Sequence, residues 1–327
     1  MRILVAGGAG FIGSNLCERL IEAGDTVWCL DNLLTGAAPN VAHLYSENGF
    51  HFIPANAKDV PDLDVEQIYN LASPTAPGAY QRYPRETLEA NIAGTEALLR
   101  LAERRKARML QASTIRVTEE LERSMLPCTT NCYLDDRYGA DSPHACYVEG
   151  KREAERLCRE YYEKHNVDVK VARLYNTYGP RMARDDSRVV PTFVRRAIEG
   201  EPLLIAGDGT QRDSFCYIDD MLDALVTFMN SDIKFGPMEF GYPLPISIHD
   251  LAKLTKKITD SASPIKFNGV KRSARELEAK KRRPVPDIRE ARSRLGWTPH
   301  VELGDGIMAM ADYYRGGGRW QSADRNL

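Results

Sequence analysis

Two side chains that could perform acid–base chemistry, Tyr147 and Lys151, lie four residues apart in the sequence. On a helix this spacing places the phenol and the ammonium on the same face, one turn apart. A nearby ammonium favours the phenolate form of a tyrosine, which could then act as a general base toward a substrate hydroxyl. Because the spacing also arises by chance, its meaning depends on the surrounding elements.

A third polar group follows a predicted strand. The apolar stretch 107–112 is typical of a buried strand, and it runs directly into Ser113 and Thr114. Either hydroxyl at the end of that strand could lie beside the tyrosine. We therefore expect Ser113 or Thr114 to join Tyr147 and Lys151 in a catalytic group.

A glycine-rich turn near the start of the chain predicts a dinucleotide site. The apolar strand 2–6 is followed by Gly7, Gly10 and Gly13 and then by an amphipathic helix over 14–23. This order places backbone N–H groups at a helix N-terminus, where they can bind a pyrophosphate. A glycine turn without a ligand is the alternative, and the complete strand–turn–helix context disfavours it.

An acidic residue, Asp31, ends the next predicted strand, 26–30. A carboxylate about 20 residues after such glycines is placed to hydrogen-bond an adenosine ribose. It would repel a 2′-phosphate, and no arginine follows in 32–34. The sequence therefore predicts NAD rather than NADP as the cofactor.

Predicted strands and helices alternate through the first half of the chain, which predicts an α/β fold with a doubly wound parallel sheet. Further strands are expected at 49–53, 67–72 and 169–174, with helices at 84–105 and from Tyr147 to about residue 165. The alternation is lost after about residue 178. We therefore expect a Rossmann domain over 1–178, joined by a returning segment near 215–230, and a smaller, mostly substrate-binding domain over 179–327. Residues 119–145 form a long irregular stretch that could be a functional loop.

Composition excludes several classes of function. The 327 residues carry a net charge of −2, which gives no indication of nucleic acid or a membrane surface as a partner. The seven cysteines show no metal-type pairing, so we predict no metal site and reduced thiols in a cytoplasmic protein. The first predicted strand follows Met1 directly, so no signal peptide is expected, and no apolar run is long enough for a membrane span.

These motifs together resemble the extended short-chain dehydrogenase/reductases, a family of NAD-dependent nucleotide-sugar epimerases, dehydratases and decarboxylases. The resemblance covers essentially the whole chain, and within the family it is closest to the UDP-glucuronate decarboxylases, or UDP-xylose synthases. It implies a homodimer that pairs through helices at about 86–105 and 147–165. It also implies the cofactor-binding residues Gly7, Gly10, Phe11, Ile12, Gly13, Asp31, Asn32, Asn56, Leu71, Ala72, Asn91, Tyr147 and Lys151.

The resemblance also implies a reaction. NAD would oxidise C4 of a sugar, Tyr147 would take the hydroxyl proton, Lys151 would tune it, and Thr114 would hold the oxygen. A carboxylate on C5 could then leave as carbon dioxide, because the 4-ketone accepts its electrons. The implied substrate-binding residues are Pro74, Tyr80, Arg116, Asn176, Arg181, Val190, Arg212 and Arg283.

The sequence departs from the decarboxylases just after Thr114. Their Ser-Thr-Ser-Glu-Val is replaced by Ser113-Thr114-Ile115-Arg116-Val117, so the serine and glutamate that manage the carboxylate and the proton are absent. The dehydratases' Thr-Asp-Glu is absent too. Arg116 could bind a substrate carboxylate, which would hinder decarboxylation by stabilising the charged ground state, or it could point elsewhere.

Further departures fall on the expected diphosphate and base. Where the decarboxylases have an arginine on a phosphate, this chain has Asp213, and Arg212 stands one position earlier. Ala206 replaces a tyrosine that often lies against uracil, and Arg283 lies near another family arginine. A shift of the loop could let Arg212 and Arg283 serve the phosphates. Otherwise the substrate could be a nucleoside carrying a uronic acid without a diphosphate.

The sequence therefore predicts an NAD-dependent enzyme acting at C4 of a nucleotide-linked sugar. Decarboxylation of UDP-glucuronate or a close analogue is the leading prediction. The alternatives are 4-epimerisation, an enzyme for a uronic-acid nucleoside, and a non-catalytic NAD-binding regulator. The intact Thr114, Tyr147 and Lys151 argue against the regulator.

Overall fold

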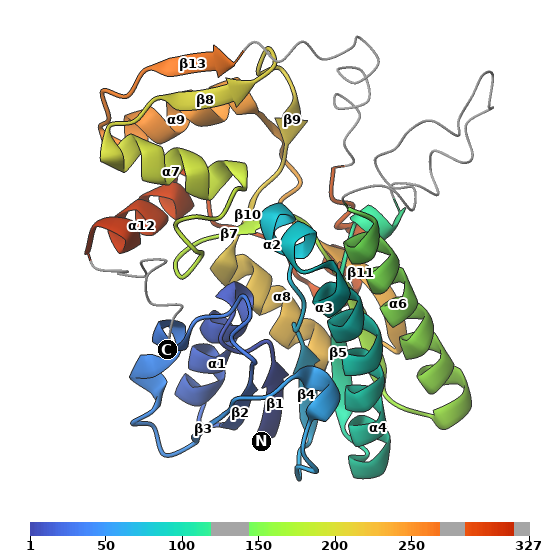
Figure 1. Cartoon of the computed structure of the whole chain (residues 1–327). Coiled ribbons are helices and arrows are strands. Elements are labelled where there is room, and N and C mark those ends of the chain that lie inside the picture. Colours follow the sequence, from blue (N-terminus) through green and yellow to red (C-terminus); the bar gives the residue numbers. More distant parts are fainter. Residues whose placement is uncertain (119–143, 269–284, 317–327) are drawn as a thin grey trace, which may run out of the picture. The chain divides into compact units, whose positions relative to one another are not determined.

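The computed structural model describes residues 1–118, 144–268 and 285–316 (Figure 1). The chain divides into two compact units. Unit 1 comprises residues 1–174 and 224–238, and unit 2 comprises residues 175–223 and 239–327. The segment that returns to unit 1 is thus 224–238, where the sequence suggested 215–230.

A seven-stranded sheet forms the centre of unit 1 and confirms the predicted α/β class. Its strand order is β11-β6-β5-β4-β1-β2-β3, and the five neighbouring pairs from β6 to β3 are parallel. Such a sheet, with crossover helices between its strands, is the doubly wound arrangement. The strands are β1 (Arg2–Ala6), β2 (Thr26–Leu30), β3 (Phe50–Ile53), β4 (Gln67–Asn70), β5 (Arg108–Thr114), β6 (Val169–Leu174) and β11 (Phe235–Phe240).

Helices lie along this sheet, and the sequence predicted those that follow the first strand, at 84–105 and from residue 147, but not the one at 77–82. The helices of unit 1 are α1 (Phe11–Glu22), α2 (Pro77–Arg82), α3 (Pro84–Glu89), α4 (Thr95–Arg105) and α6 (Ala145–His165), with 3₁₀ turns η1 (Ala38–Asn40), η2 (Ala42–Leu44) and η3 (Ala57–Asp59). Helix α8 (Ile218–Asn230) begins in unit 2 and continues into unit 1 from residue 224. The predicted helix over 84–105 is helical throughout, but a π-helical turn, η4 (Ala90–Gly94), lies between α3 and α4. Such turns often occur at functional sites, since the extra residue redirects the side chains around it.

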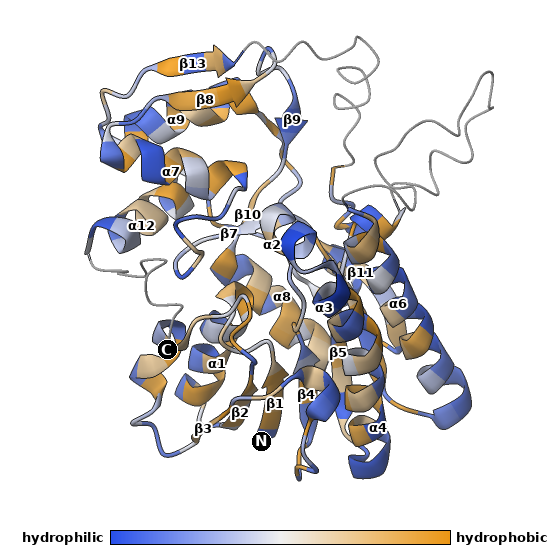
Figure 2. Cartoon of the chain, viewed as in Figure 1, coloured by the Kyte–Doolittle hydropathy of each residue, from blue (hydrophilic) through white to orange (hydrophobic). Residues whose placement is uncertain are grey.

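The core of unit 1 follows from the alternation of side chains along its strands. Leu4 and Ala6 of β1 belong to a buried cluster with residues of α4 and α6, such as Leu98 and Cys158. Figure 2 shows the central strands as hydrophobic, whereas the helices carry both hydrophobic and hydrophilic faces. The apolar faces of α4 and α6 therefore fix these helices on the sheet.

Unit 2 is built from short strands and helices. Its strands pair as β7 (Thr177–Tyr178) with β10 (Cys216–Tyr217), β8 (Leu203–Ala206) with β13 (Ile265–Asn268), and β9 (Arg212–Asp213) with β12 (Ile246–Ser247). Its helices are α7 (Val189–Glu199), α9 (Ile248–Thr259), α11 (Arg289–Leu295) and α12 (Leu303–Gly316). In the described part of the chain, no helix is both long and apolar enough to cross a membrane.

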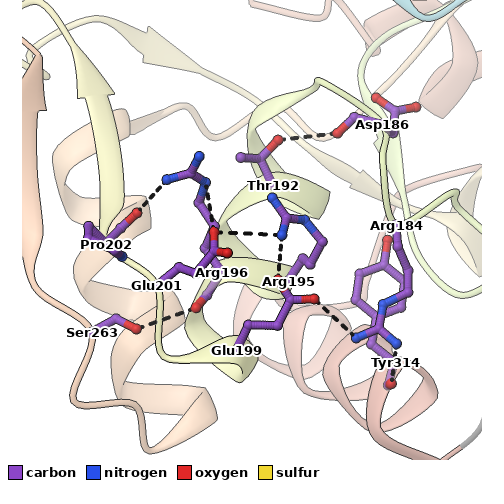
Figure 3. Close-up of polar contacts among 10 residues, drawn as sticks. All are labelled: Arg184, Asp186, Thr192, Arg195, Arg196, Glu199, Glu201, Pro202, Ser263 and Tyr314. Carbon is purple, nitrogen blue, oxygen red and sulfur yellow. Dashed lines mark hydrogen bonds and ion pairs between the residues drawn. The ribbon is translucent and has the colours of Figure 1, made fainter.

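A polar network ties α7 to α12 in unit 2 (Figure 3). Glu199 accepts contacts from Arg195 and, at 3.7 Å, from Arg184. Arg184 also donates to the carbonyl of Tyr314 on α12, at 3.2 Å. On the other side of α7, Arg196 donates to the carbonyl of Pro202 at 2.8 Å. These contacts hold the helix that carries Val190.

Candidate active site

The glycine turn between β1 and α1 has the shape of a phosphate-binding cradle. Gly7 has a positive φ of 77°, and a Cβ there would lie 2.7 Å from the carbonyl carbon of Leu71. A Cβ on Gly13 would lie only 2.1 Å from the carbonyl oxygen of Gly7. Gly10 is the N-cap of α1, with no side chain to satisfy the first N–H groups of the helix. Those donors can therefore bind an anionic group, which is what a pyrophosphate requires.

Asp31 connects β2 to this turn. One of its carboxylate oxygens accepts the backbone N–H of Ala9 at 3.0 Å, and the other accepts that of Leu33 at 2.8 Å. Burial raises the pKa of this carboxyl group, and the backbone hydrogen bonds from Leu33, Ala9 and Gly10 oppose that shift. Asp31 thus fixes the glycine turn as well as presenting an acceptor beside it.

A pocket opens over the carboxyl ends of the strands in unit 1, the usual place for a ligand in this kind of sheet. It brings together eight of the predicted residues: Gly7, Gly10, Asp31, Asn32, Asn56, Leu71, Ala72 and Pro74. Phe11, Ile12 and Gly13 follow the pocket residue Gly10 as the first residues of helix α1. Asn32 donates to Asn56 at 2.7 Å, so these two pocket residues position each other. The residues present fit NAD, because the turn leaves room for a pyrophosphate and the pocket extends past Asp31.

Asn91 lies in the π-helical turn η4 and is fully buried. Its amide donates to the hydroxyl of Ser73 at 2.9 Å and to the carbonyl of Thr87 at 2.8 Å. Its Oδ1 has no hydrogen-bond partner among the residues that the structure describes. A buried acceptor left unsatisfied in this way indicates a site for a hydroxyl or water.

The predicted catalytic residues lie on β5 and α6, which pack against each other. Tyr147 and Lys151 are on one face of α6 and are 7% and 3% exposed, and Thr114 is the buried last residue of β5. The Nζ of Lys151 donates to the carbonyl of Ala112, two residues before Thr114, at 2.9 Å. Burial lowers the pKa of Lys151 to about 8. The amino group of Lys151 is therefore held next to the end of β5, and burial makes it easier for this group to lose its proton.

A charged cluster that the sequence did not predict lies at the same contact between β5 and α6 and stabilises it. Glu155, one turn after Lys151, accepts the hydroxyl of Ser113 at 2.6 Å. It also binds Arg173 of β6 through two hydrogen bonds, at 2.9 and 2.7 Å. Such a two-pronged contact holds α6 in one register against β5 and β6. The i, i+4 spacing from Lys151 was the only signal for Glu155 in the sequence.

Tyr80 of α2 lies directly against the predicted catalytic tyrosine. The rings of Tyr80 and Tyr147 are stacked, with centroids 5.1 Å apart and planes 9° apart. The hydroxyl of Tyr80 is hydrogen-bonded to Nδ1 of His144 at 2.5 Å. His144 was not among the predicted site residues, since a lone histidine before a helix carries no distinctive pattern.

The remaining predicted substrate residues are distributed over both units. Arg116 follows β5 in unit 1, and its backbone N–H donates to Oγ1 of Thr114 at 3.4 Å. Arg181 has a positive φ of 67°, and Val190 is buried at the start of α7. Both belong to unit 2. Arg283 lies outside the described residues, as does most of the irregular stretch 119–145.

The neighbouring charged side chains of Arg212 and Asp213 in unit 2 have different partners. Asp213 accepts the amide of Asn176 at 2.7 Å and the backbone N–H of Ser214 at 3.1 Å. Arg212 is exposed and donates to the carbonyl of Pro245 at 2.6 Å. The carboxylate, rather than the guanidinium, thus contacts the predicted substrate residue Asn176.

Three groups with metal-binding side chains lie within 4.8 Å of one another in unit 2: Asp220, Asp223 and His300. The carboxylate of Asp220 is already engaged by the chain. It accepts the backbone N–H groups of His300 and Val301, each at 3.0 Å, and pairs with the His300 ring at 2.8 Å. This cluster is explained as a fixed connection between α8 and the segment before α12.

Comparison with known proteins places this geometry in a family. Residues 3–237 match the NAD dependent epimerase/dehydratase family. The chain is 39% identical to UDP-glucuronic acid decarboxylase 1 of Xenopus tropicalis over 96% of its length and 72% of the relative's. It is also 39% identical to UDP-glucuronic acid decarboxylase 2 of Arabidopsis thaliana, over 96% of this chain and 68% of that one.

Solved structures agree with this assignment. The UDP-glucuronic acid 4-epimerase of Bacillus cereus, in complex with UDP-glucuronic acid and NAD, superposes with a TM-score of 0.79 at 26% identity. That match covers 97% of this chain and 99% of the other. The UDP-glucose 4-epimerase of Thermotoga maritima, with UDP-glucose, gives a TM-score of 0.79 at 25% identity, over 97% of this chain and 99% of that one. The chain therefore belongs to the NAD-dependent epimerase/dehydratase family, and it is an NAD-dependent enzyme that modifies nucleotide-linked sugars.

Proposed function

We propose that this enzyme oxidises C4 of UDP-glucuronate or a close analogue and then releases the C5 carboxylate as carbon dioxide. The observation that carries the proposal is the 39% identity to UDP-glucuronic acid decarboxylases over 96% of the chain. NAD, when bound, supplies a reversible hydride acceptor for the carbon that is oxidised. The glycine turn with Gly7, Gly10 and Gly13, together with Asp31 and Asn91, would hold it.

The chain's own side chains would manage the proton of the C4 hydroxyl. Tyr147 would take it, and the buried Lys151 beside it would stabilise the resulting negative charge. Thr114 would donate a hydrogen bond to the same oxygen. The hydrogen bond from Lys151 to Ala112 supports this division of roles, because it anchors the ammonium at the end of the strand that carries Thr114.

Arg116 supports 4-epimerisation of the same kind of substrate as the second candidate. An arginine that pairs with the C5 carboxylate would stabilise the charged ground state and so slow its loss. Epimerisation needs only proton and hydride transfer at C4 and a sugar that can turn over. The similarity to the UDP-glucuronic acid 4-epimerase of Bacillus cereus supports this candidate as well.

The charges around Asn176 support a third candidate, a uronic-acid nucleoside without a diphosphate. Asp213 contacts Asn176 directly, whereas Arg212 is bonded to the Pro245 carbonyl. A carboxylate near a diphosphate is strongly unfavourable where water is excluded. This candidate fails if UDP-sugars bind tightly, Arg212→Ala abolishes that binding, and no uronic-acid nucleoside is converted.

One experiment separates the three candidates. The purified protein is incubated with NAD and UDP-glucuronate, and the products are followed by mass spectrometry and by the absorbance of reduced nicotinamide. Loss of carbon dioxide supports decarboxylation, and an isomer of unchanged mass supports epimerisation. If the wild type does not convert UDP-glucuronate but does convert a uronic-acid nucleoside, the third candidate is supported. Tyr147→Phe is the negative control for all three.

We also propose that the enzyme works in the cytoplasm as a homodimer that pairs through the helices at 86–105 and 147–165. The outer surface of these helices carries exposed residues such as Ile92, Arg100 and Arg156. Light scattering after size-exclusion chromatography tests the dimer. A monomer at micromolar concentration would contradict it.

A further inference from the structure

We infer that Tyr80 is a positioning residue that holds the ring of Tyr147 in its reactive orientation, and that His144 locks Tyr80 in place. The inference rests on the proposed role of Tyr147 as the proton acceptor. It gives Tyr80 a role different from the substrate contact that the resemblance implied.

The first step of the argument is the contact between the two rings. Tyr80 is 1% exposed and Tyr147 is 7% exposed, and they form a separate buried cluster with Val148. Their planes differ by only 9° at a centroid separation of 5.1 Å. One face of the Tyr147 ring is thus covered by a flat, buried surface, which restricts rotation about its side-chain bonds.

The second step is that Tyr80 is itself fixed at both ends. Its hydroxyl is hydrogen-bonded to Nδ1 of His144 at 2.5 Å, and the two rings meet edge to face at 5.6 Å. The thiol of Cys146 reaches the backbone carbonyl of Tyr80 at 3.5 Å. Tyr80 therefore cannot move without breaking contacts with the start of helix α6.

The third step is that His144 belongs to the same local frame as Tyr147. The carbonyl of His144 accepts the backbone N–H groups of Tyr147 and Val148, at 3.2 and 3.1 Å. The residue that precedes α6 thus fixes the backbone of Tyr147 directly and its ring through Tyr80. Together, these contacts fix the direction in which the Tyr147 side chain projects from α6.

Steady-state kinetics of four variants test the inference on the substrate that the wild type converts. Tyr80→Leu removes the stacking surface, and we expect kcat to fall about 100-fold, the effect of a misplaced catalytic group. Tyr80→Phe keeps the ring but loses the hydrogen bond, so we expect a loss of less than about tenfold. His144→Ala should resemble Tyr80→Phe, and His144→Asn, which retains a hydrogen-bonding group near the Nδ1 position, should recover the activity. KM should stay within about threefold throughout, since no substrate contact is removed.

A matched control lies at the other end of the same helix. Tyr161 is also buried and stacked on a histidine, His165, with centroids 4.6 Å apart. Tyr161→Leu removes a similar packing surface far from Tyr147 along α6, and we expect its kcat to match the wild type. Equal losses of kcat in Tyr161→Leu and Tyr80→Leu would overturn the inference. So would an effect of Tyr80→Leu on KM with kcat unchanged. If Tyr80→Leu does not fold, equal activities of His144→Ala and His144→Asn overturn it.

A substrate-independent measurement separates this inference from the proposed function. With ring-labelled tyrosine, the NMR signal of Tyr147 is assigned by its loss in Tyr147→Phe. We expect this signal to shift in Tyr80→Leu and to stay nearly unchanged in Tyr80→Phe, because the neighbouring ring is retained. An unchanged signal in Tyr80→Leu overturns the positioning role even if no nucleotide sugar is converted. A wild type that converts none, together with a shifted signal, contradicts only the proposed function.

Discussion

Replacing Lys151 with methionine should change how the stability of the cofactor-free protein depends on pH. Lys151 is 3% exposed, and burial lowers its pKa from 10.5 to about 8. In the unfolded chain the ammonium is solvated and keeps the higher pKa. Protonation therefore favours the unfolded state, so the wild type is least stable below the folded pKa and gains stability as the pH rises toward 10.5.

The size of the effect follows from the shift. A difference of about 2.5 units corresponds to about 3.4 kcal/mol at most, at roughly 1.36 kcal/mol per unit. Between about pH 7 and pH 10, two-state linkage gives a gain of about 2.5 kcal/mol in the wild type relative to Lys151→Met. Lys151→Met lacks the hydrogen bond to Ala112 at every pH. The loss of this bond therefore does not change how the difference in unfolding free energy between the two proteins depends on pH.

Urea unfolding of the wild type and Lys151→Met across this pH range measures the difference, and subtraction removes the groups that titrate in both proteins. Lys164→Met, an exposed position on the same helix, is the control and should show a constant difference from the wild type. A free-energy difference between wild type and Lys151→Met that stays constant within about 0.5 kcal/mol would refute the reasoning, because the lysine would then be solvated in the folded state.

Three further predictions follow from the site. Tyr147→Phe should lower turnover by about 10²- to 10⁴-fold while NAD still binds, as activity assays and calorimetry with NAD would show, and retained turnover would assign the proton transfer elsewhere. Gly13→Ala should abolish NAD binding or folding, because its Cβ would lie 2.1 Å from a backbone carbonyl oxygen. Gly78→Ala, which has open space, is its control in NAD titrations and thermal melts, and equal NAD binding by the two would contradict the cradle. Arg173→Leu should destabilise the protein by about 3 kcal/mol in urea, because it leaves the largely buried Glu155 without its ionic partner, and a loss below about 1 kcal/mol would mean that water replaces the arginine.

Several features of this protein could be predicted from the sequence because they depend on neighbours along the chain. The strands at 2–6, 26–30 and 169–174 have the predicted bounds, since each is a short run of mainly apolar residues that can be recognised from the sequence itself. The glycine turn is likewise a local requirement, in which close backbone contacts exclude a Cβ. The placement of Tyr147 and Lys151 on one face follows from the helical repeat alone.

Other features depend on residues that meet only after folding. The π-helical turn at Ala90–Gly94 interrupts a sequence that has ordinary helical periodicity, and it contains the buried Asn91. Tyr80 contacts Tyr147 at a sequence separation of 67, and Glu155 contacts Ser113 from another element. A histidine, a tyrosine or a glutamate has no distinctive spacing that would reveal such partners. The sequence alone therefore determined most strands of the sheet, most of the helices and the types of residue that we expect to be catalytic. Only the tertiary structure decided which side chains of α2, α6 and β5 contact them, because those contacts depend on three-dimensional distance rather than on sequence separation.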